Sequence, residues 1–249
     1  MEESFARVET KYLLTAAQAA ALEAGLYRQG FRRADFGSPR IQSLYYDTAD
    51  YALIRASLER PGYKEKLRLR AYGEPGSVVT AYPEIKKKYR GVVYKRRTEM
   101  PLEEAMACLA SGALPEAAGQ VGRELAWMLQ RYSLQPAAVI AYDRDAWLSD
   151  REPGVRVTLD RNLQFRDWEM DLNSRSSGIL LIPPEMRLLE IKTGRHLPLW
   201  LAALLRDADV RRMHFSKYGL AYQRYIMPET QKQERNDSEC STVSLSMGA

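Results

Sequence analysis

Three consecutive segments between residues 63 and 97 carry positive charge at alternate positions, and this pattern most constrains the fold. They read YKEKLRLRAY, VVTAYPEIKKKY and VVYKRRTEM. Side chains of a β-strand alternate between its two faces, so alternate residues of the first segment share one face. That face carries Lys64, Lys66, Arg68 and Arg70. The opposite face carries Glu65 and three small or apolar residues. The segment therefore predicts a strand with a row of cations on one side.

Two turn signals predict that the three segments are neighbouring antiparallel strands. They are Glu74-Pro75-Gly76 and Arg90-Gly91. In this arrangement the second and third strands extend the charged face with Glu84, Lys86, Lys88, Lys95 and Arg97. Like charges on neighbouring strands repel each other. Such a face therefore requires either open water or a multivalent anion.

The net charge also indicates an anionic ligand. The 249-residue chain has a formal charge of +5. Its last part, from Glu229 onward, holds two basic and four acidic residues and contributes −2, which leaves +7 on the rest. An excess of this size attracts polyanions such as nucleic acid, anionic membranes, nucleotides or condensed phosphate.

The composition predicts one globular domain. The chain is 45% hydrophobic and 28% charged, which is enough for one substantial core. The periodicity is lost after Pro228, so we expect a domain over residues 1–228 and a disordered tail over 229–249. The sequence shows neither a signal peptide nor a disulfide framework, and its longest apolar run, residues 197–205, is too short to span a membrane. We therefore expect a cytoplasmic protein with no transmembrane segment.

Hydrophobic periodicity predicts an α+β fold. Besides the three segments above, strands are expected at residues 5–14, 41–46, 137–147, 155–165 and 187–193. Helices are expected at residues 15–29, 102–109, 119–132, 198–206 and 216–225, with a short helical or irregular passage at 50–57. The later strands also carry cations on one face, among them Arg144, Arg156 and Lys192. A sheet closed into a barrel would turn these cations inward and form a wet basic tunnel.

Three glutamates, Glu9, Glu84 and Glu190, fall on the same strand faces as the cations. Mg²⁺ and Mn²⁺ prefer hard oxygen ligands and are often held by one or two carboxylates together with substrate phosphates. The three glutamates are therefore candidate metal ligands. Each could equally be the ion-pair partner of a neighbouring lysine, and this alternative remains open.

Nine motifs, taken in order, resemble those of a known family. They are RVETKY, SLYYDT, KLRLR, PEIKKK, YKRR, AYDRDAW, VRVTLD, LLEIKTG and FSKYGLAY. Together they resemble the VTC domain, the catalytic domain of vacuolar transporter chaperone polyphosphate polymerases, in the triphosphate tunnel metalloenzyme superfamily. The resemblance covers about residues 5–225. It implies an antiparallel β-barrel tunnel of about eight strands with flanking helices, which binds a polyphosphate or nucleoside triphosphate together with a divalent metal ion.

The resemblance also implies roles for individual residues. Cations that act on phosphate would be Lys11, Arg68, Arg70, Lys86, Arg144, Arg156 and Lys217. Further substrate contacts would be Lys95, Arg97, Lys192 and Ser216. Glu190 resembles the metal-binding glutamate, with Glu84 and Glu9 as further candidates. Ser216 also stands where a helix N-cap is expected, and the free amides of a helix N-terminus can bind an anion, although an ordinary cap is the alternative.

One motif departs from the wider superfamily, whose first strand carries an ExExK signature. Here Arg7 stands at the position of the first glutamate. This departure suits the VTC branch and argues against two-metal triphosphatase or cyclase chemistry.

The resulting functional expectation is the synthesis of inorganic polyphosphate from ATP with Mn²⁺ or Mg²⁺ as cofactor. The expected ligands are ATP, inorganic polyphosphate, pyrophosphate and tripolyphosphate, and a membrane-protein partner is left open. Nucleic acid is not expected, because a closed tunnel cannot admit a duplex. Two alternatives stay open: hydrolysis of triphosphate or nucleoside triphosphate in the same tunnel, and a noncatalytic polyanion-binding module. The sequence has no P-loop, dinucleotide-binding or zinc-binding motif.

Overall fold

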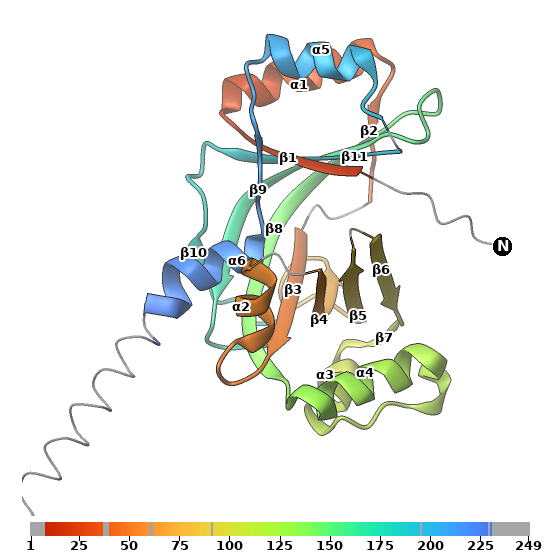
Figure 1. Ribbon diagram of the computed structural model, residues 1–249, viewed down its shortest axis with the longest axis vertical. Helices are drawn as coiled ribbons and strands as arrows, with labels where there is room; N and C mark the ends of the chain where they lie inside the picture. The colour runs from red at the N-terminus through yellow and green to blue at the C-terminus, as the bar shows by residue number, and fades with distance from the viewer. Residues whose placement is uncertain are drawn as a thin grey trace, which may run out of the picture.

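The computed structural model describes residues 8–36, 40–59, 62–90, 92–194, 196–228 and 230. The predictions about Arg7 and most of the tail, residues 229 and 231–249, lie outside the described residues. One antiparallel sheet of 12 strands organises the described part of the chain. Pairs of helices lie around this sheet (Figure 1).

Eight strands of the described sheet are six residues or longer, which confirms the expected number. They are β1 (Val8–Leu14), β3 (Arg40–Asp47), β4 (Tyr63–Tyr72), β5 (Thr80–Tyr89), β6 (Val92–Arg97), β8 (Gln135–Leu148), β9 (Arg156–Arg166) and β11 (Arg187–Thr193). The other four have two residues each: β2 (Arg32–Arg33), β7 (Met100–Pro101), β10 (Ile179–Leu180) and β12 (Arg212–Met213).

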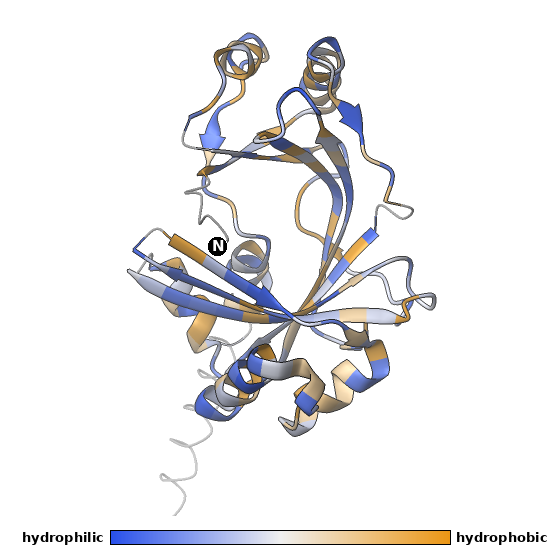
Figure 2. Ribbon diagram, turned by 90° about the vertical axis from the view of Figure 1, so that its right-hand side faces the viewer, coloured by the Kyte–Doolittle hydropathy of each residue, from blue (hydrophilic) through white to orange (hydrophobic). Residues whose placement is uncertain are grey.

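The sheet is bent into a tunnel-like shape but is not closed. Its strand order is β12-β1-β11-β9-β8-β3-β4-β5-β6, and among the described residues no pairing joins β6 to β1 or β12. The expectation of a fully closed barrel is therefore corrected. Lys86 on β5 nevertheless interacts electrostatically with Glu9 and Lys11 on β1. The two ends of the sheet thus face each other across a shared interior, as the curvature in Figure 2 shows.

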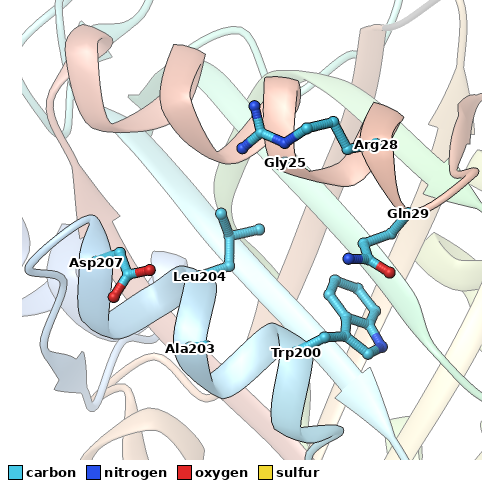
Figure 3. A pocket seen from close by; sticks show the side chains of 7 residues that line it. All are labelled: Gly25, Arg28, Gln29, Trp200, Ala203, Leu204 and Asp207. Carbon is cyan, nitrogen blue, oxygen red and sulfur yellow. The ribbon is translucent and has the colours of Figure 1, made fainter.

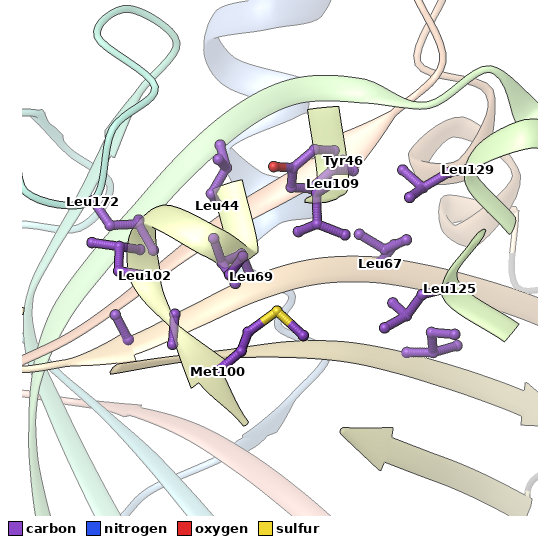
Figure 4. Packing of buried hydrophobic residues seen from close by; sticks show 14 of the residues in the cluster. Leu44, Tyr46, Leu67, Leu69, Met100, Leu102, Leu109, Leu125, Leu129 and Leu172 are labelled. Atoms are coloured by element: carbon purple, nitrogen blue, oxygen red, sulfur yellow. The ribbon is translucent and has the colours of Figure 1, made fainter. Parts of the chain in front are cut away.

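Helices α3 (Leu102–Ser111) and α4 (Gly119–Tyr132), joined by a short 3-10 turn at Glu116–Ala118, cover one half of the outer face. They pack on the apolar face of the basic meander, where Leu67, Leu69 and Leu125 are fully buried (Figure 4). Each buried leucine contributes about 1.5–3 kcal/mol. This burial fixes which face of β4 and β5 points outward, so their cations face the interior.

Helices α1 (Ala16–Arg28) and α5 (Leu199–Asp207) cover the other half of the outer face, over β1, β11 and β9. Thr15 and Gln18 form a capping box at the start of α1, which confirms the predicted N-cap. Gly25 allows a close approach of the two helices, since a Cβ there would lie 2.4 Å from Leu204 Cδ1. A cavity of about 240 Å³ lies beside this contact (Figure 3).

Helix α2 (Ala52–Leu58) and helix α6 (Lys217–Ala221), which continues as a π-helical turn (Tyr222–Ile226), pack against the inner side of the sheet. Ile54 of α2, Tyr218 of α6 and Ile140 of β8 belong to one apolar cluster. The Asp47 carboxylate accepts hydrogen bonds from the backbone amides of Leu53 and Ile54 and from the Tyr218 hydroxyl, and so joins the two helices. These helices place Ser216 and Lys217 at the interior. No helix in the described residues is long and apolar enough to cross a membrane.

Candidate functional site

The strand register places the cations of the basic meander in rows, as the sequence predicts. Lys66 on β4 pairs with Lys86 on β5, which pairs with Lys95 on β6. In the next row Glu84 lies between Arg68 and Arg97. Because the opposite faces of these strands are covered by α3 and α4, both rows line the interior.

A second group of charges, on β1, β8, β9, β11 and α6, holds equal numbers of cations and carboxylates. Arg144 and Lys217 each contact both Asp160 and Glu190, at distances of 2.6–3.0 Å. Lys11 adds contacts to Glu190 at 3.3 Å and to Glu9 at 3.2 Å. Three cations are thus matched by three carboxylates. This group forms a fixed charged wall, whereas an excess of cations lies elsewhere in the lining.

Glu190 stays ionised although it is buried. Burial by itself would raise the pKa of this carboxyl, but Lys217, Lys11 and Arg144 outweigh that effect and hold the pKa well below its ordinary value. Burial would likewise lower the pKa of Lys217, yet Asp160 and Glu190 raise it above the ordinary value. The carboxylate and its cations therefore stabilise one another in their charged forms.

Glu84 is the counter-ion of the basic meander. It is fully buried, forms an ion pair with Arg68, and lies 2.8 Å from Lys95 Nζ. Burial would raise its pKa, but Arg68, Arg70 and Lys95 lower it to about 2. One carboxylate thus fixes cations on two different strands, β4 and β6.

For three interior lysines the neighbouring groups that favour the charged form do not outweigh burial and the repelling cations. Burial lowers the pKa of Lys66 to about 8; Lys86 and other neighbouring lysines add to the shift, and Tyr45 opposes it. Burial also lowers the pKa of Lys192 to about 8; Arg144 and Lys86 add to the shift, and Glu9 and Glu190 oppose it. Burial lowers the pKa of Lys86 as well. Glu9 opposes this shift, whereas Arg68 and Lys11 add to it. Positive charge is therefore in excess where β4, β5 and β11 face one another.

The other predicted residues lie on or near the same lining. Arg70 is buried, and its Nε lies 3.4 Å from Ser43 Oγ. Arg97 is exposed and lies over the Tyr82 ring, 4.8 Å from its centroid. Arg156 is exposed at the end of β9 opposite Lys192. Ser216 caps α6 by accepting from the Gly219 amide and also lies 3.3 Å from Lys66 Nζ, so its two predicted roles are compatible.

The three candidate metal ligands do not form one cluster. Glu9 and Glu190 converge on the Lys11 ammonium, whereas Glu84 is engaged by Arg68 and Lys95. Within the described ranges no group of three His, Cys, Asp or Glu side chains could hold a metal ion. The carboxylates of Glu9 and Glu190, which already share one cation, fit a hard divalent ion that takes its remaining ligands from phosphates.

Three residues of the lining, Asp160, Tyr142 and Tyr45, were not predicted from the sequence. Asp160 follows Arg156 and Thr158 at the same parity, and Tyr142 precedes Arg144 at the same parity, so the alternation could have identified both. Tyr142 lies under Lys217, whose Nζ is 4.4 Å from the ring centroid. Tyr45 stacks on Tyr218, and its hydroxyl also accepts a hydrogen bond of 3.2 Å from Arg68.

Comparison with known families agrees with this geometry. The sequence profile of the VTC domain matches residues 6–226. The chain belongs to the VTC domain family. No curated protein sequence matches this VTC domain.

Solved structures also resemble this chain, and the first one below has the same fold. A candidate adenylate cyclase from Bacillus halodurans is 15% identical, with a TM-score of 0.53, over 88% of this chain and 96% of that one. A candidate adenylate cyclase from Vibrio parahaemolyticus is 14% identical, with a TM-score of 0.46, over 87% of this chain and 97% of that one. At such identities the likeness concerns the fold alone.

Proposed function

We propose that this VTC domain transfers the γ-phosphate of ATP to the end of an inorganic polyphosphate chain. The observation that carries the proposal is the excess of interior cations contributed by β4, β5 and β11. The depressed pKa values of Lys66 and Lys192 reflect burial and mutual repulsion of these cations, which a bound phosphate chain would relieve. A linear polyanion therefore fits this interior better than a neutral or singly charged ligand.

The lining suits phosphoryl transfer because that reaction depends mainly on positioning and charge neutralisation. Lys66 and Lys86 belong to one wall and Lys192 to the facing wall, so they can contact different oxygens of one phosphate chain. The acceptor would be the terminal oxygen of a polyphosphate, which is already ionised and needs little help from a general base. Pyrophosphate or tripolyphosphate would serve as primers, and the use of ATP suits a cytoplasmic location.

A Mn²⁺ or Mg²⁺ ion would be held by Glu190, with Glu9 as the next candidate, and would neutralise charge on the reacting phosphates. Glu84 is engaged by the cations of two other strands, so we assign it the positioning of Arg68 and Lys95. Lys217 and Arg144 would hold the Glu190 carboxylate in one orientation through their contacts with Asp160.

The decisive assay supplies ATP, Mn²⁺ and a short polyphosphate primer, and resolves the products by chain length. Elongated chains support the proposal. Release of orthophosphate alone would identify a hydrolase, and binding without turnover would identify a polyanion-binding module.

Two neighbouring lysines provide a matched pair of variants for this assay. Lys86 faces the interior, whereas Lys87 faces outward, where it lies near Glu65 and Glu124. Lys86→Met should lower elongation by about tenfold or more, because a cation that contacts charge in the transition state is lost. Lys87→Met should leave elongation unchanged. Equal losses would show that general surface charge accounts for the effect.

A further inference from the structure

Strand β6 forms a free edge of the sheet. All six of its residues are exposed, and among the described residues its only strand partner is β5. The strand lies at the outer side of the sheet in Figure 1. An edge strand presents unpaired backbone N–H and C=O groups that can pair with another extended chain.

The outer face of this edge offers apolar contact next to a cavity. Tyr94 is 53% exposed and points to the same side as Arg96. Both line a cavity of about 280 Å³ between the sheet and α4, together with Ile85, Lys87, Gln120 and Glu124. When a strand is added to a sheet edge, its main chain supplies affinity and pockets for alternate side chains supply specificity. The cavity is placed to receive a side chain of such a strand.

The charge of the edge restricts which strand can bind. Lys95 and Arg97 lie on its inner face, where Glu84 is the ion-pair partner of Lys95, and Arg96 lies on its outer face in an ion pair with Glu124. The inner rows nevertheless hold more cations than carboxylates, since Lys66, Lys86 and Arg68 also belong to them. A second copy of β6 would bring these cations opposite one another, which is unfavourable. An acidic strand would bring carboxylates beside them, which complementary charge favours.

We propose that the free edge of β6 binds an extended, acidic segment of a partner protein by strand addition. The segment pairs its backbone with residues 92–97. It places apolar side chains over Tyr94 and the cavity on the outer face, and carboxylates beside Lys95 and Arg97 on the inner face. The contact is made along the sheet edge, so the proposal does not depend on which reaction is catalysed in the interior.

The probe for this proposal is a fluorescently labelled, end-blocked peptide of alternating valine and glutamate, about eight residues long, as in a typical strand. Its binding is measured by fluorescence anisotropy in the absence of tripolyphosphate, so that Lys95 and Arg97 remain accessible to the glutamates of the peptide. Two control peptides have the same sequence with alternate backbone nitrogens methylated, one for each of the two possible registers of methylation. Methylation on the pairing side should weaken binding by at least about tenfold, because several main-chain hydrogen bonds are lost.

Variants of the protein test the location. Arg96→Glu should weaken binding of the unmethylated peptide by about tenfold, since it places a carboxylate beside Glu124 on the face where the valines of the peptide pack. Arg28→Glu, an equal charge change on α1 at the far helix pair, should have no effect. A circular dichroism spectrum and tripolyphosphate binding like those of the unaltered protein show that Arg96→Glu is folded.

Several results would overturn the proposal. Equal binding of the methylated peptides would show that the main chain is not used. Equal effects of the two arginine variants would place the peptide elsewhere. Self-association of the protein through β6, or binding to phosphatidylglycerol vesicles with none to the peptide, would assign this edge to a different partner.

Discussion

The Nζ atom of Lys217, the first residue of α6, lies 2.9 Å from Oε1 of Glu190 in the middle of β11. The same carboxylate also contacts Lys11 and Arg144. A residue proposed to bind metal is thus also the anion that holds three cations of the interior. Substitution of Glu190 therefore affects both roles, and experiments must separate them.

Glu190→Gln should lower turnover by about 100-fold or more, the effect expected for loss of an electrostatic catalytic group. Tripolyphosphate should still bind without metal, and more tightly, because three cations have lost a competing carboxylate. Added Mn²⁺ should restore turnover only in part. Calorimetric binding without metal and polymer synthesis across a Mn²⁺ titration measure the two effects.

Asp160→Asn is the matched control, since Asp160 contacts Arg144 and Lys217 as Glu190 does. Both variants should lower the melting temperature because each leaves buried cations with fewer counter-ions. Only Glu190→Gln should change the dependence on Mn²⁺. The same change in Asp160→Asn would show that Glu190 acts through its cations alone.

Arg68→Met and Arg70→Met should both weaken phosphate binding but should differ in stability. Arg68 is an ion-pair partner of the fully buried Glu84, so its loss should cost about 3 kcal/mol of unfolding free energy. Arg70 makes a long hydrogen bond to Ser43, contacts Tyr72 and attracts Glu84 from a greater distance, so its loss should cost less, about 1 kcal/mol. Chemical denaturation of the ligand-free variants measures this difference. Equal stabilities would mean that the contact of Arg68 with Glu84 contributes no more to folding than the contacts of Arg70.

Tripolyphosphate affinity should fall more than tenfold between about 20 mM and about 150 mM salt, because several cations of the lining contact one polyanion. Orthophosphate makes fewer contacts and should show a shallower dependence. Titrations of both ligands across a salt series provide the comparison. A flat response for tripolyphosphate would be inconsistent with a binding site built from many charges.

Tripolyphosphate affinity should also fall between about pH 7 and about pH 9, by roughly three- to tenfold, as Lys66 and Lys192 lose their protons near pH 8. Binding near pH 8 should be accompanied by proton uptake, because the bound anion favours charged lysines. Calorimetry in two buffers with different ionisation enthalpies measures this uptake. Lys66→Arg, which stays charged, should reduce both effects.

Lys66 and Lys192 should also make stability depend on pH, in the direction opposite to that of tripolyphosphate affinity. Their pKa values are lower in the folded protein than in the unfolded chain, so the unfolded chain binds more protons between about pH 8 and about pH 10. Their contribution to stability should therefore rise with pH over this range, while affinity for the anion falls.

Tyr45 titrates in the same pH range as these lysines. Burial would raise the pKa of Tyr45, but Arg68, Lys66 and Arg70 lower it to about 8. The variant Tyr45→Phe separates its titration from that of the lysines.

The sequence by itself determined the eight longer strands and the faces of their side chains, but not the four strands of two residues. Alternation along residues 64–70 predicted the row of cations, and Thr15 predicted the start of α1, because both depend on local backbone geometry. The turn residues near Gly76 and Arg90 were sufficient to predict that Lys66, Lys86 and Lys95 lie side by side.

Only the tertiary structure decided which charges neutralise one another. Lys217 meets Asp160 and Glu190 because α6 packs against the inner side of a sheet whose strands come from distant parts of the chain. Alternation assigns a residue to a face but cannot say which strand stands opposite it. For the same reason the sequence could not divide the three glutamates between two sets of cations, or show that β6 is left as a free edge.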